Sequence, residues 1–222
     1  MSHTQIRRRT AAVLIPLAAL TLGTVTACGG NDDDNARADT TSQATTSAAP
    51  ADPAALTCRG ESIDESAPIH YRAETMIHAP LSTVWNLHTD VERWSAWQQA
   101  VATIERLDQG PLREGSQFRW TTPVPATAIT PATTLSITSS VQQVEQNKCI
   151  RWTGPALGEG VRVDNGTHVW NFTEVDGGVL VRTEENWSGP QVEADVPTST
   201  GFLGAGLETW LAELKKTAEA QH

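Results

Sequence analysis

The chain has few of the residues that mark several large classes of protein. Lysine and arginine number 16 against 26 acidic residues in 222, and no basic cluster follows Arg9. Because nucleic acids are bound mainly through basic side chains on phosphates, this balance argues against a nucleic-acid partner. The sequence also lacks a nucleophile elbow, a zinc-protease helix, a P-loop and a dinucleotide-binding turn. We therefore expect no cofactor and no metal centre.

The N-terminus has no apolar run long enough to span a bilayer. Its apolar segment, from Ala11 to about Leu22, has about 12 residues, whereas a membrane-spanning helix needs about 20. The segment follows Arg7–Arg9 and precedes small residues, which is the order of a removable secretory signal. The stretch Val25-Thr26-Ala27-Cys28 resembles the lipobox of bacterial lipoproteins. The resemblance implies cleavage before Cys28, a lipid on its thiol and extracytoplasmic anchoring to the bacterial membrane. An ordinary signal peptide is the alternative.

Composition divides the remaining chain into a tether and one domain. Removing the signal, residues 1–27, takes away three arginines and no acidic residue, leaving 13 basic against 26 acidic side chains. Residues 28–55 hold almost nothing large and apolar, so we expect a disordered tether after the lipidated cysteine. Residues 56–222 are enough for one domain with a core. Oligomeric state and protein partners leave no signal that we can identify.

Cysteine is scarce, and its number is informative. With Cys28 lipidated, only Cys58 and Cys149 remain. A pair of cysteines in an exported domain favours a disulfide, which would close a loop of about 90 residues. Two free buried thiols are the alternative.

Hydrophobic periodicity predicts an α+β domain. Residues 69–77 alternate as a half-buried strand, and residues 81–88 have helical spacing. Asp90 is a good N-cap for a second short helix. Strands and turns follow up to residue 189, and a broad apolar face predicts a long helix over 200–219. One segment is expected to be a long flexible loop, with glycine or proline at 154, 155, 158, 160 and 166.

With its predicted strands and helices in this order, the chain resembles the START-like, or SRPBCC, superfamily, specifically its polyketide cyclase/dehydrase-like branch. The resemblance is carried by Ile77-His78-Ala79-Pro80, Asp90-Val91-Glu92-Arg93-Trp94-Ser95-Ala96-Trp97, Ile150-Arg151-Trp152-Thr153-Gly154, His168-Val169-Trp170-Asn171-Phe172 and Trp210-Leu211-Ala212-Glu213-Leu214-Lys215. It implies a helix-grip fold, in which a curved antiparallel sheet of about seven strands wraps around one long C-terminal helix. It also implies a deep, mostly apolar cavity for lipids, sterols, hormones or aromatic polyketides. Some members catalyse cyclisation or dehydration, but the family shares no catalytic motif.

Tryptophan is abundant, with eight residues against one tyrosine and three phenylalanines. Trp85 and Trp210 lie on apolar helix faces and are expected in the core. Trp94 and Trp97 lie where the family places the cavity mouth, although packing is the simpler role. The tryptophans on the inner sheet face would either fill the cavity or form its wall. The candidate ligand-binding residues are Trp97, Phe118, Trp120, Trp152, His168, Trp170, Glu185, Trp187 and Phe202.

Two polar residues stand out among these candidates. His168 and Glu185 share the inward phase of two strands joined at Asp176-Gly177-Gly178, a strong hairpin signal. An Asp-Gly turn would place His168 directly opposite Glu185, whereas a Gly-Gly turn would place Trp170 there. The pair is interpreted as a structural contact, as anchors for a ligand headgroup, or as an acid–base pair. A bulge near Asn186 would instead turn Glu185 outward.

Three functions remain open. The leading hypothesis is a lipid-anchored domain outside the cytoplasm that binds or carries a small hydrophobic ligand. The second is a cyclase- or dehydratase-type enzyme that uses His168 and Glu185. The third is a protein-interaction scaffold whose cavity is filled by its own tryptophans.

Overall fold

The computed structural model describes residues 55–126 and 131–221. The predicted signal peptide, Cys28 and all of the tether except its last residue lie outside the described residues. No helix in the described ranges is long and apolar enough to cross a membrane.

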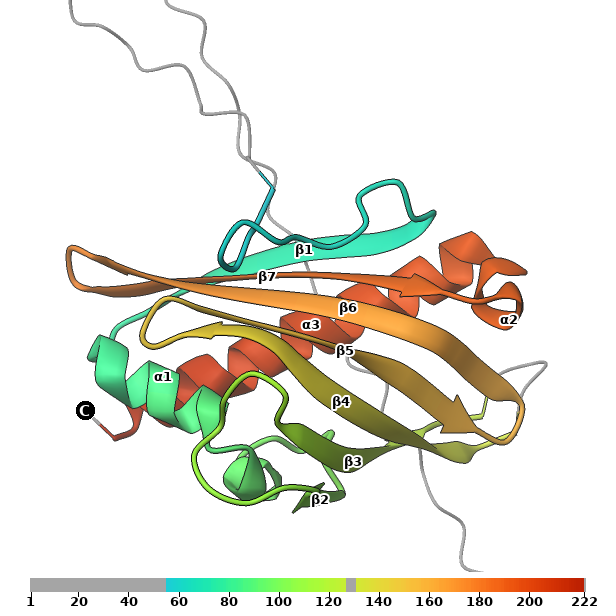
Figure 1. Cartoon of the computed structure of the whole chain (residues 1–222), viewed down its shortest axis with the longest axis horizontal. Helices are drawn as coiled ribbons and strands as arrows, with labels where there is room; N and C mark the ends of the chain where they lie inside the picture. Colours follow the sequence, from blue (N-terminus) through green and yellow to red (C-terminus); the bar gives the residue numbers. More distant parts are fainter. Residues whose placement is uncertain (1–54, 127–130, 222) are drawn as a thin grey trace, which may run out of the picture. The chain divides into compact units, whose positions relative to one another are not determined.

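The domain is a seven-stranded antiparallel sheet that curves around a long helix (Figure 1). The spatial order is β1-β7-β6-β5-β4-β3-β2. The strands are β1 (Ile69–Ile77), β2 (Thr103–Arg106), β3 (Gln117–Val124), β4 (Thr133–Glu145), β5 (Cys149–Gly158), β6 (Val161–Val175) and β7 (Gly178–Ser188). The helices are α1 (Leu81–Thr89), the 3-10 helix η1 (Val91–Ala96), α2 (Pro190–Glu193) and α3 (Val196–Glu219). This arrangement confirms the predicted helix-grip fold.

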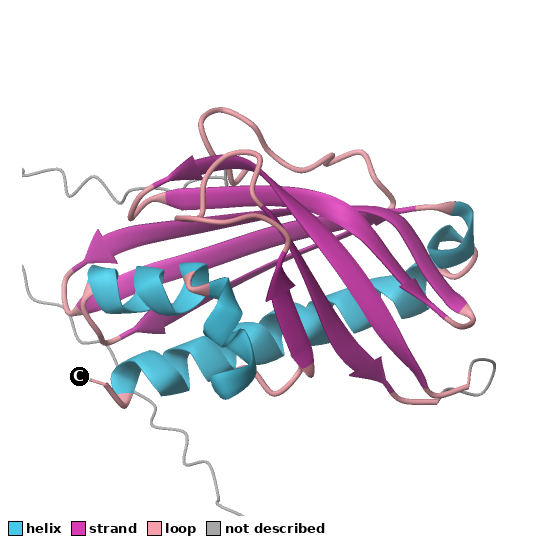
Figure 2. Cartoon of the chain, turned by 60° about the horizontal axis from the view of Figure 1, so that its bottom comes forward, coloured by secondary structure: helices cyan, strands magenta, loops and turns pink. Residues whose placement is uncertain are grey.

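Helix α3 supplies the apolar face that the sheet grips. Its buried residues follow the predicted helical spacing: Leu203, Leu207, Trp210, Leu211, Leu214 and Ala218. The helix begins at Val196, earlier than the sequence predicted, because Asp195 accepts a hydrogen bond from the Thr198 backbone N–H at 3.1 Å. Pro197 is tolerated in the first turn because a backbone N–H there would have no helical partner. The helix lies across the sheet (Figure 2). It packs mainly against β1.

The prediction of a helix capped by Asp90 is only partly right. Asp90 occupies the N-cap position of η1, but its side chain makes no capping hydrogen bond, and the segment is a 3-10 helix. A tertiary contact fixes it instead, since the Trp94 indole N–H donates to the His88 carbonyl at 2.9 Å. Trp94 is thereby held in the interior.

The prediction of a flexible loop over residues 154–167 is wrong. Strand β5 continues to Gly158 and β6 starts at Val161, so a short turn joins them. The glycines serve close packing: a Cβ on Gly154 would lie 1.8 Å from the Thr138 carbonyl oxygen. A Cβ on Gly158 would lie 2.9 Å from Leu135 Cδ2. Glycine is needed here for space between strands.

An N-terminal strap, residues 55–67, lies on the outer face of the sheet. The Cys58–Cys149 disulfide joins it to β5, with Cα atoms 5.3 Å apart, as predicted. Both sulfurs are buried in an apolar cluster that also contains Leu56, Ile63 and Val169. Beside this cluster, Glu184 pairs with Arg72 at 3.0 Å and accepts from the Leu56 backbone N–H at 3.2 Å. The strap therefore covers the polar outer phase of β7.

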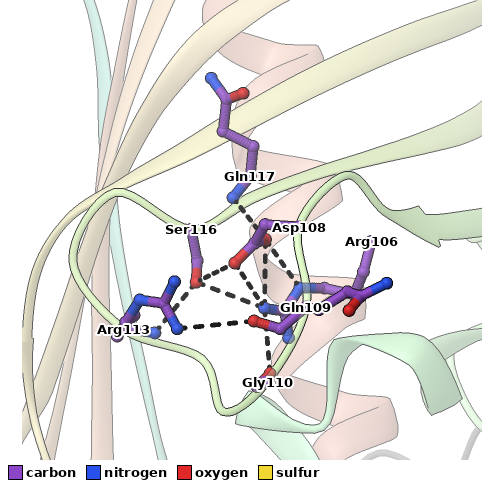
Figure 3. A network of polar contacts seen from close by, with 7 residues as sticks. All are labelled: Arg106, Asp108, Gln109, Gly110, Arg113, Ser116 and Gln117. Carbon is purple, nitrogen blue, oxygen red and sulfur yellow. Dashed lines mark hydrogen bonds and ion pairs between the residues drawn. The ribbon is translucent and has the colours of Figure 1, made fainter.

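Polar contacts organise the connection between β2 and β3 (Figure 3). The Asp108 carboxylate accepts hydrogen bonds from Arg106 at 3.1 Å, from the Ser116 hydroxyl at 2.9 Å and from the Gln117 backbone N–H at 3.0 Å. The Arg113 backbone N–H donates in turn to Ser116 Oγ at 3.1 Å. The hydrogen bond from Arg106 is the main reason that the pKa of Asp108 falls to about 2. This network fixes both ends of the connection.

Candidate functional site

The interior between α3 and the sheet is filled with aromatic rings. Trp94 lies at its centre, with perpendicular ring contacts to Trp210 at 4.9 Å and Phe118 at 5.3 Å between centroids. Trp152 and Trp170 join from β5 and β6 and are buried. Trp85 and Trp210 are also buried, as expected of core residues. We call this group, together with Trp97, Trp120, Phe172 and His88, the aromatic cluster.

Three other candidate ligand-binding residues lie outside the centre of this cluster. Trp97 is half-buried and contacts Trp210 at 6.1 Å between centroids. Trp187 is half-buried and packs beside Leu203 and Leu207, in a separate apolar group. Phe202 is 47 % exposed, which is contrary to its prediction as a ligand-binding residue of an interior cavity. It precedes the buried Leu203 by one residue, which rotates it by roughly 100° toward solvent on a helix.

Two hollows among the described residues lie outside the centre of the grip. One, of about 730 Å³, lies between the N-terminal strap and the β4–β5 turn. The other, of about 340 Å³, lies between η1 and the end of α3 and is lined by Trp97. Both open to solvent. The space where the resemblance implied a deep cavity holds the rings of the aromatic cluster.

Part of the concave sheet face is nevertheless reached by solvent. Trp120, Ile137 and Ala156 are only half-buried, although they lie in the inward phase of β3, β4 and β5. Beside them, Gly166 pairs with Gly154 across β5 and β6, so these two neighbouring positions carry no side chain. These residues form an apolar surface that borders the aromatic cluster and shares Trp120 with it. We call it the open inner face.

At the border of the open inner face lies the predicted polar pair. Val175 pairs with Gly178, so the Asp-Gly turn is the one formed and the alternative Gly-Gly register is wrong. His168 stands directly opposite Glu185. His168 Nδ1 lies 3.0 Å from Glu185 Oε2. The structure therefore brings the two candidates together, and no bulge turns Glu185 outward.

Neighbouring side chains fix both members of the pair. The Trp187 indole N–H donates to Glu185 Oε1 at 2.7 Å. His168 Nε2 lies 2.6 Å from the Thr183 hydroxyl, which also contacts the Val169 carbonyl at 3.2 Å. Opposite Trp187, a Cβ on Gly166 would come within 3.3 Å of Glu185 Oε1. Both carboxylate oxygens are thus occupied, and the imidazole orientation is set.

Burial shifts the pKa values of His168 and Glu185 in opposite directions. Loss of hydration raises the pKa of Glu185 to about 7, against a smaller lowering by the Trp187 hydrogen bond. Burial also lowers the pKa of His168 well below its usual value, and His88 nearby adds to the effect. Near neutral pH the pair can therefore hold one proton between Oε2 and Nδ1. Such a group can donate or accept a proton, or a hydrogen bond, at the edge of an apolar surface.

His88 is a functional candidate that the sequence analysis missed. It is fully buried in α1, 4.3 Å from Trp170 and 5.6 Å from Trp152 between ring centroids. Neither ring nitrogen has a hydrogen-bond partner among the described residues. Burial lowers its pKa to about 3, so the imidazole is neutral. Its helical spacing from Trp85 signalled burial, but nothing in the sequence signalled that it would lack a partner.

The described residues contain no group of three histidine, cysteine or acidic side chains placed to hold a metal ion.

A curved antiparallel sheet around a long C-terminal helix is the START-like helix-grip fold. The chain belongs to the family described as polyketide cyclase/dehydrase and lipid transport, whose sequence model matches residues 68–219. No curated protein matches the chain.

Solved structures share this fold at low sequence identity. A START superfamily protein from Mycobacterium smegmatis has a TM-score of 0.54 and 13 % identity, over 69 % of this chain and 99 % of its own. The protein TTHA0849 from Thermus thermophilus has a TM-score of 0.53 and 18 % identity, over 68 % and 98 %. The di-domain ARO/CYC StfQ of the steffimycin biosynthetic pathway has a TM-score of 0.54 and 14 % identity, over 69 % and 52 %.

Proposed function

We propose that this domain binds a small hydrophobic ligand on the open inner face, with a polar group of the ligand at His168 and Glu185. The observation that carries the proposal is a hydrogen-bonded polar pair at the edge of a solvent-reached apolar surface. Removing apolar surface from water contributes roughly 25 cal/mol per Å², so Trp120, Ile137 and Ala156 favour an apolar ligand. A family that includes lipid transport supports the same assignment.

We further propose that the domain acts outside the cytoplasm, held at the bacterial membrane by a lipid on Cys28. The N-terminal order of charge, apolar segment and small residues supports export. The Cys58–Cys149 disulfide suits an oxidising compartment. Metabolic labelling with an alkyne fatty acid tests the anchor: label should enter the natural chain and be absent from Cys28→Ala. Equal labelling of both proteins would refute lipidation at this residue.

Native mass spectrometry tests the binding proposal. The exported chain from residue 29 onward should carry an extra mass that leaves on extraction with organic solvent. Trp120→Ala removes apolar surface from the open inner face and should lower the fraction of protein that carries the extra mass. Phe202→Ala removes an exposed aromatic ring and should leave that fraction unchanged. A protein that carries no such mass, and binds no fatty acid, sterol or flat aromatic compound, would favour the self-filled scaffold.

A second candidate function is acid–base catalysis, which the opposite pKa shifts of His168 and Glu185 favour. A carboxyl that titrates near neutrality is suited to proton transfer. If the domain is a cyclase or dehydratase, Glu185→Gln should abolish turnover while retaining hydrogen bonding and ligand binding. Unchanged turnover in Glu185→Gln and His168→Ala would end this alternative.

A further inference from the structure

The larger of the two hollows combines segments that are far apart in the sequence. It has a volume of about 730 Å³ and lies between the N-terminal strap and the β4–β5 turn, which the disulfide joins. Asn171 of β6 and Arg182 of β7 also line it. Arg182 lies in the outward phase of β7, because its neighbours Val181 and Thr183 are buried on the other face. A hollow of this size can hold a small molecule.

Arg182 brings an unpaired positive charge to this hollow. Its Nε atom is buried and has no hydrogen-bond partner among the described residues. Glu74 stands opposite Arg182 in the register of β1 and β7, but no ion pair joins the two side chains. On the other side, the Asn171 amide N–H donates to the Thr57 carbonyl at 2.8 Å and is held by the strap. Because buried donors in native proteins nearly always have an acceptor, we expect one from outside the chain.

The charge balance around the hollow is the reverse of that of the whole chain. The chain has 26 acidic against 16 basic side chains. The charged residues that line the hollow are three basic and two acidic ones: Arg59, Lys148, Arg182, Glu145 and Glu174. Arg59 and Lys148 have carboxylate partners at exposed positions, and exposed ion pairs are weak enough for these cations to turn toward a bound anion. The hollow therefore favours a ligand group with one negative charge.

We propose that this hollow is a binding site for a small, soluble carboxylate, with Arg182 as its anchor. A guanidinium group presents its N–H donors in a planar fork that matches the two oxygens of a carboxylate. One carboxylate neutralises the unpaired charge of Arg182, whereas a phosphate dianion would add a second negative charge beside Glu145 and Glu174. The site takes another class of ligand than the open inner face and does not depend on it.

Acetate and acetamide test the proposal, because they have nearly the same size and shape and differ in charge. The arginine Nε–H signals of the exported chain from residue 29 onward are followed by nuclear magnetic resonance during titration with each compound at constant ionic strength. We expect the Arg182 signal, assigned by its loss in Arg182→Gln, to follow a saturable curve with acetate and to stay nearly unchanged with acetamide. If both compounds move this signal alike, or neither moves it, the proposal is overturned.

Charge-removing variants locate the site. With the backbone N–H signals of residues 146–148 as the readout, Arg182→Gln should weaken acetate binding at least about tenfold, since it loses a charged pair of donors. Arg93→Gln is the matched control, because Arg93 is exposed and does not line the hollow, and it should bind acetate as the natural chain does. Lys148→Gln removes an exposed cation and replaces Arg182→Gln if that variant does not fold; it should weaken binding about twofold or more.

The remaining outcomes separate this site from general charge effects and from the inner face. An equal loss of affinity in Arg182→Gln and Arg93→Gln would overturn the site, and so would no loss in either. Tighter binding of inorganic phosphate than of acetate would overturn the carboxylate assignment. Trp120→Ala should keep the full acetate response, so failure of the inner-face proposal and failure of this one can be told apart.

Discussion

Replacing Gly204 by alanine should destabilise the domain, although alanine is the better helix former. Gly204 lies where α3 crosses Tyr71 of β1. A Cβ at this position would stand 2.7 Å from Tyr71 Cε2 and 2.9 Å from Cδ2 and Cζ. The ring is not free to retreat, because its hydroxyl donates to Glu208 Oε1 at 2.5 Å. The added methyl group must therefore push the helix and strand apart.

The magnitude follows from two opposing effects. Overpacking of this kind costs typically about 1–3 kcal/mol, and exchange of glycine for alanine inside a helix gains about 1 kcal/mol. The net loss expected for Gly204→Ala is thus up to about 2 kcal/mol. Gly206 is the matched control, since a Cβ there meets nothing within 4 Å. Gly206→Ala should gain about 0.5–1 kcal/mol.

Equilibrium unfolding in urea measures both variants, and the gap between them isolates the clash because the helix-propensity gain is common to both. We expect a gap of about 1–3 kcal/mol in the free energy of unfolding. In a Tyr71→Ala background the ring is gone, so the gap should largely close. If both alanines stabilise the natural protein equally, the close approach of α3 to β1 is not as described.

Three other perturbations have defined outcomes. Replacing both Cys58 and Cys149 by alanine removes a cross-link between residues 91 positions apart in the sequence. On the chain-entropy account the free energy of unfolding measured in urea should fall by about 4–5 kcal/mol, and a loss below about 1 kcal/mol would contradict that account. Glu185 has a folded pKa raised to about 7, so its contribution is complete at acid pH and is lost as pH rises from about 4.5 through 7. Glu185→Gln, measured across that range, should lack this decline, and identical pH profiles would refute the shift. Asp108, with its pKa lowered to about 2, stabilises the fold above its ordinary pKa and loses that contribution as pH falls toward 2. Asp108→Asn should lower the melting temperature at pH 7 more than at pH 2, and an equal loss at both would contradict this.

Much of the fold could be predicted because its signals are local and periodic. Alternation marks β1, helical spacing marks α3, and Asp176-Gly177 specifies a turn whose register alone places His168 opposite Glu185. An even number of cysteines in the domain was enough to predict the Cys58–Cys149 pair.

The errors came from features that depend on distant contacts. Gly154 looks like a flexible residue until Thr138 is seen against it. Phe202 was predicted to bind the ligand because it is aromatic, but it follows the rotation set by the buried Leu203 and is exposed. His88 is harder still, because its sequence context predicts burial but not the absence of a polar partner. Whether tryptophans form a wall or fill a core also depends on how closely separate elements approach.

The position of the disulfide has a mechanical consequence. Cys58 lies ahead of the edge strand β1, yet it is bonded to Cys149 in β5, the middle strand in the order of the sheet. A pulling force on the N-terminal side of the domain would pass through the sulfurs into β5 and bypass residues 59–148. The backbone hydrogen bonds of β1 would then not be opened one after another from its end. An N-terminal load would therefore meet resistance from several strands at once, which favours a domain that stays folded under tension.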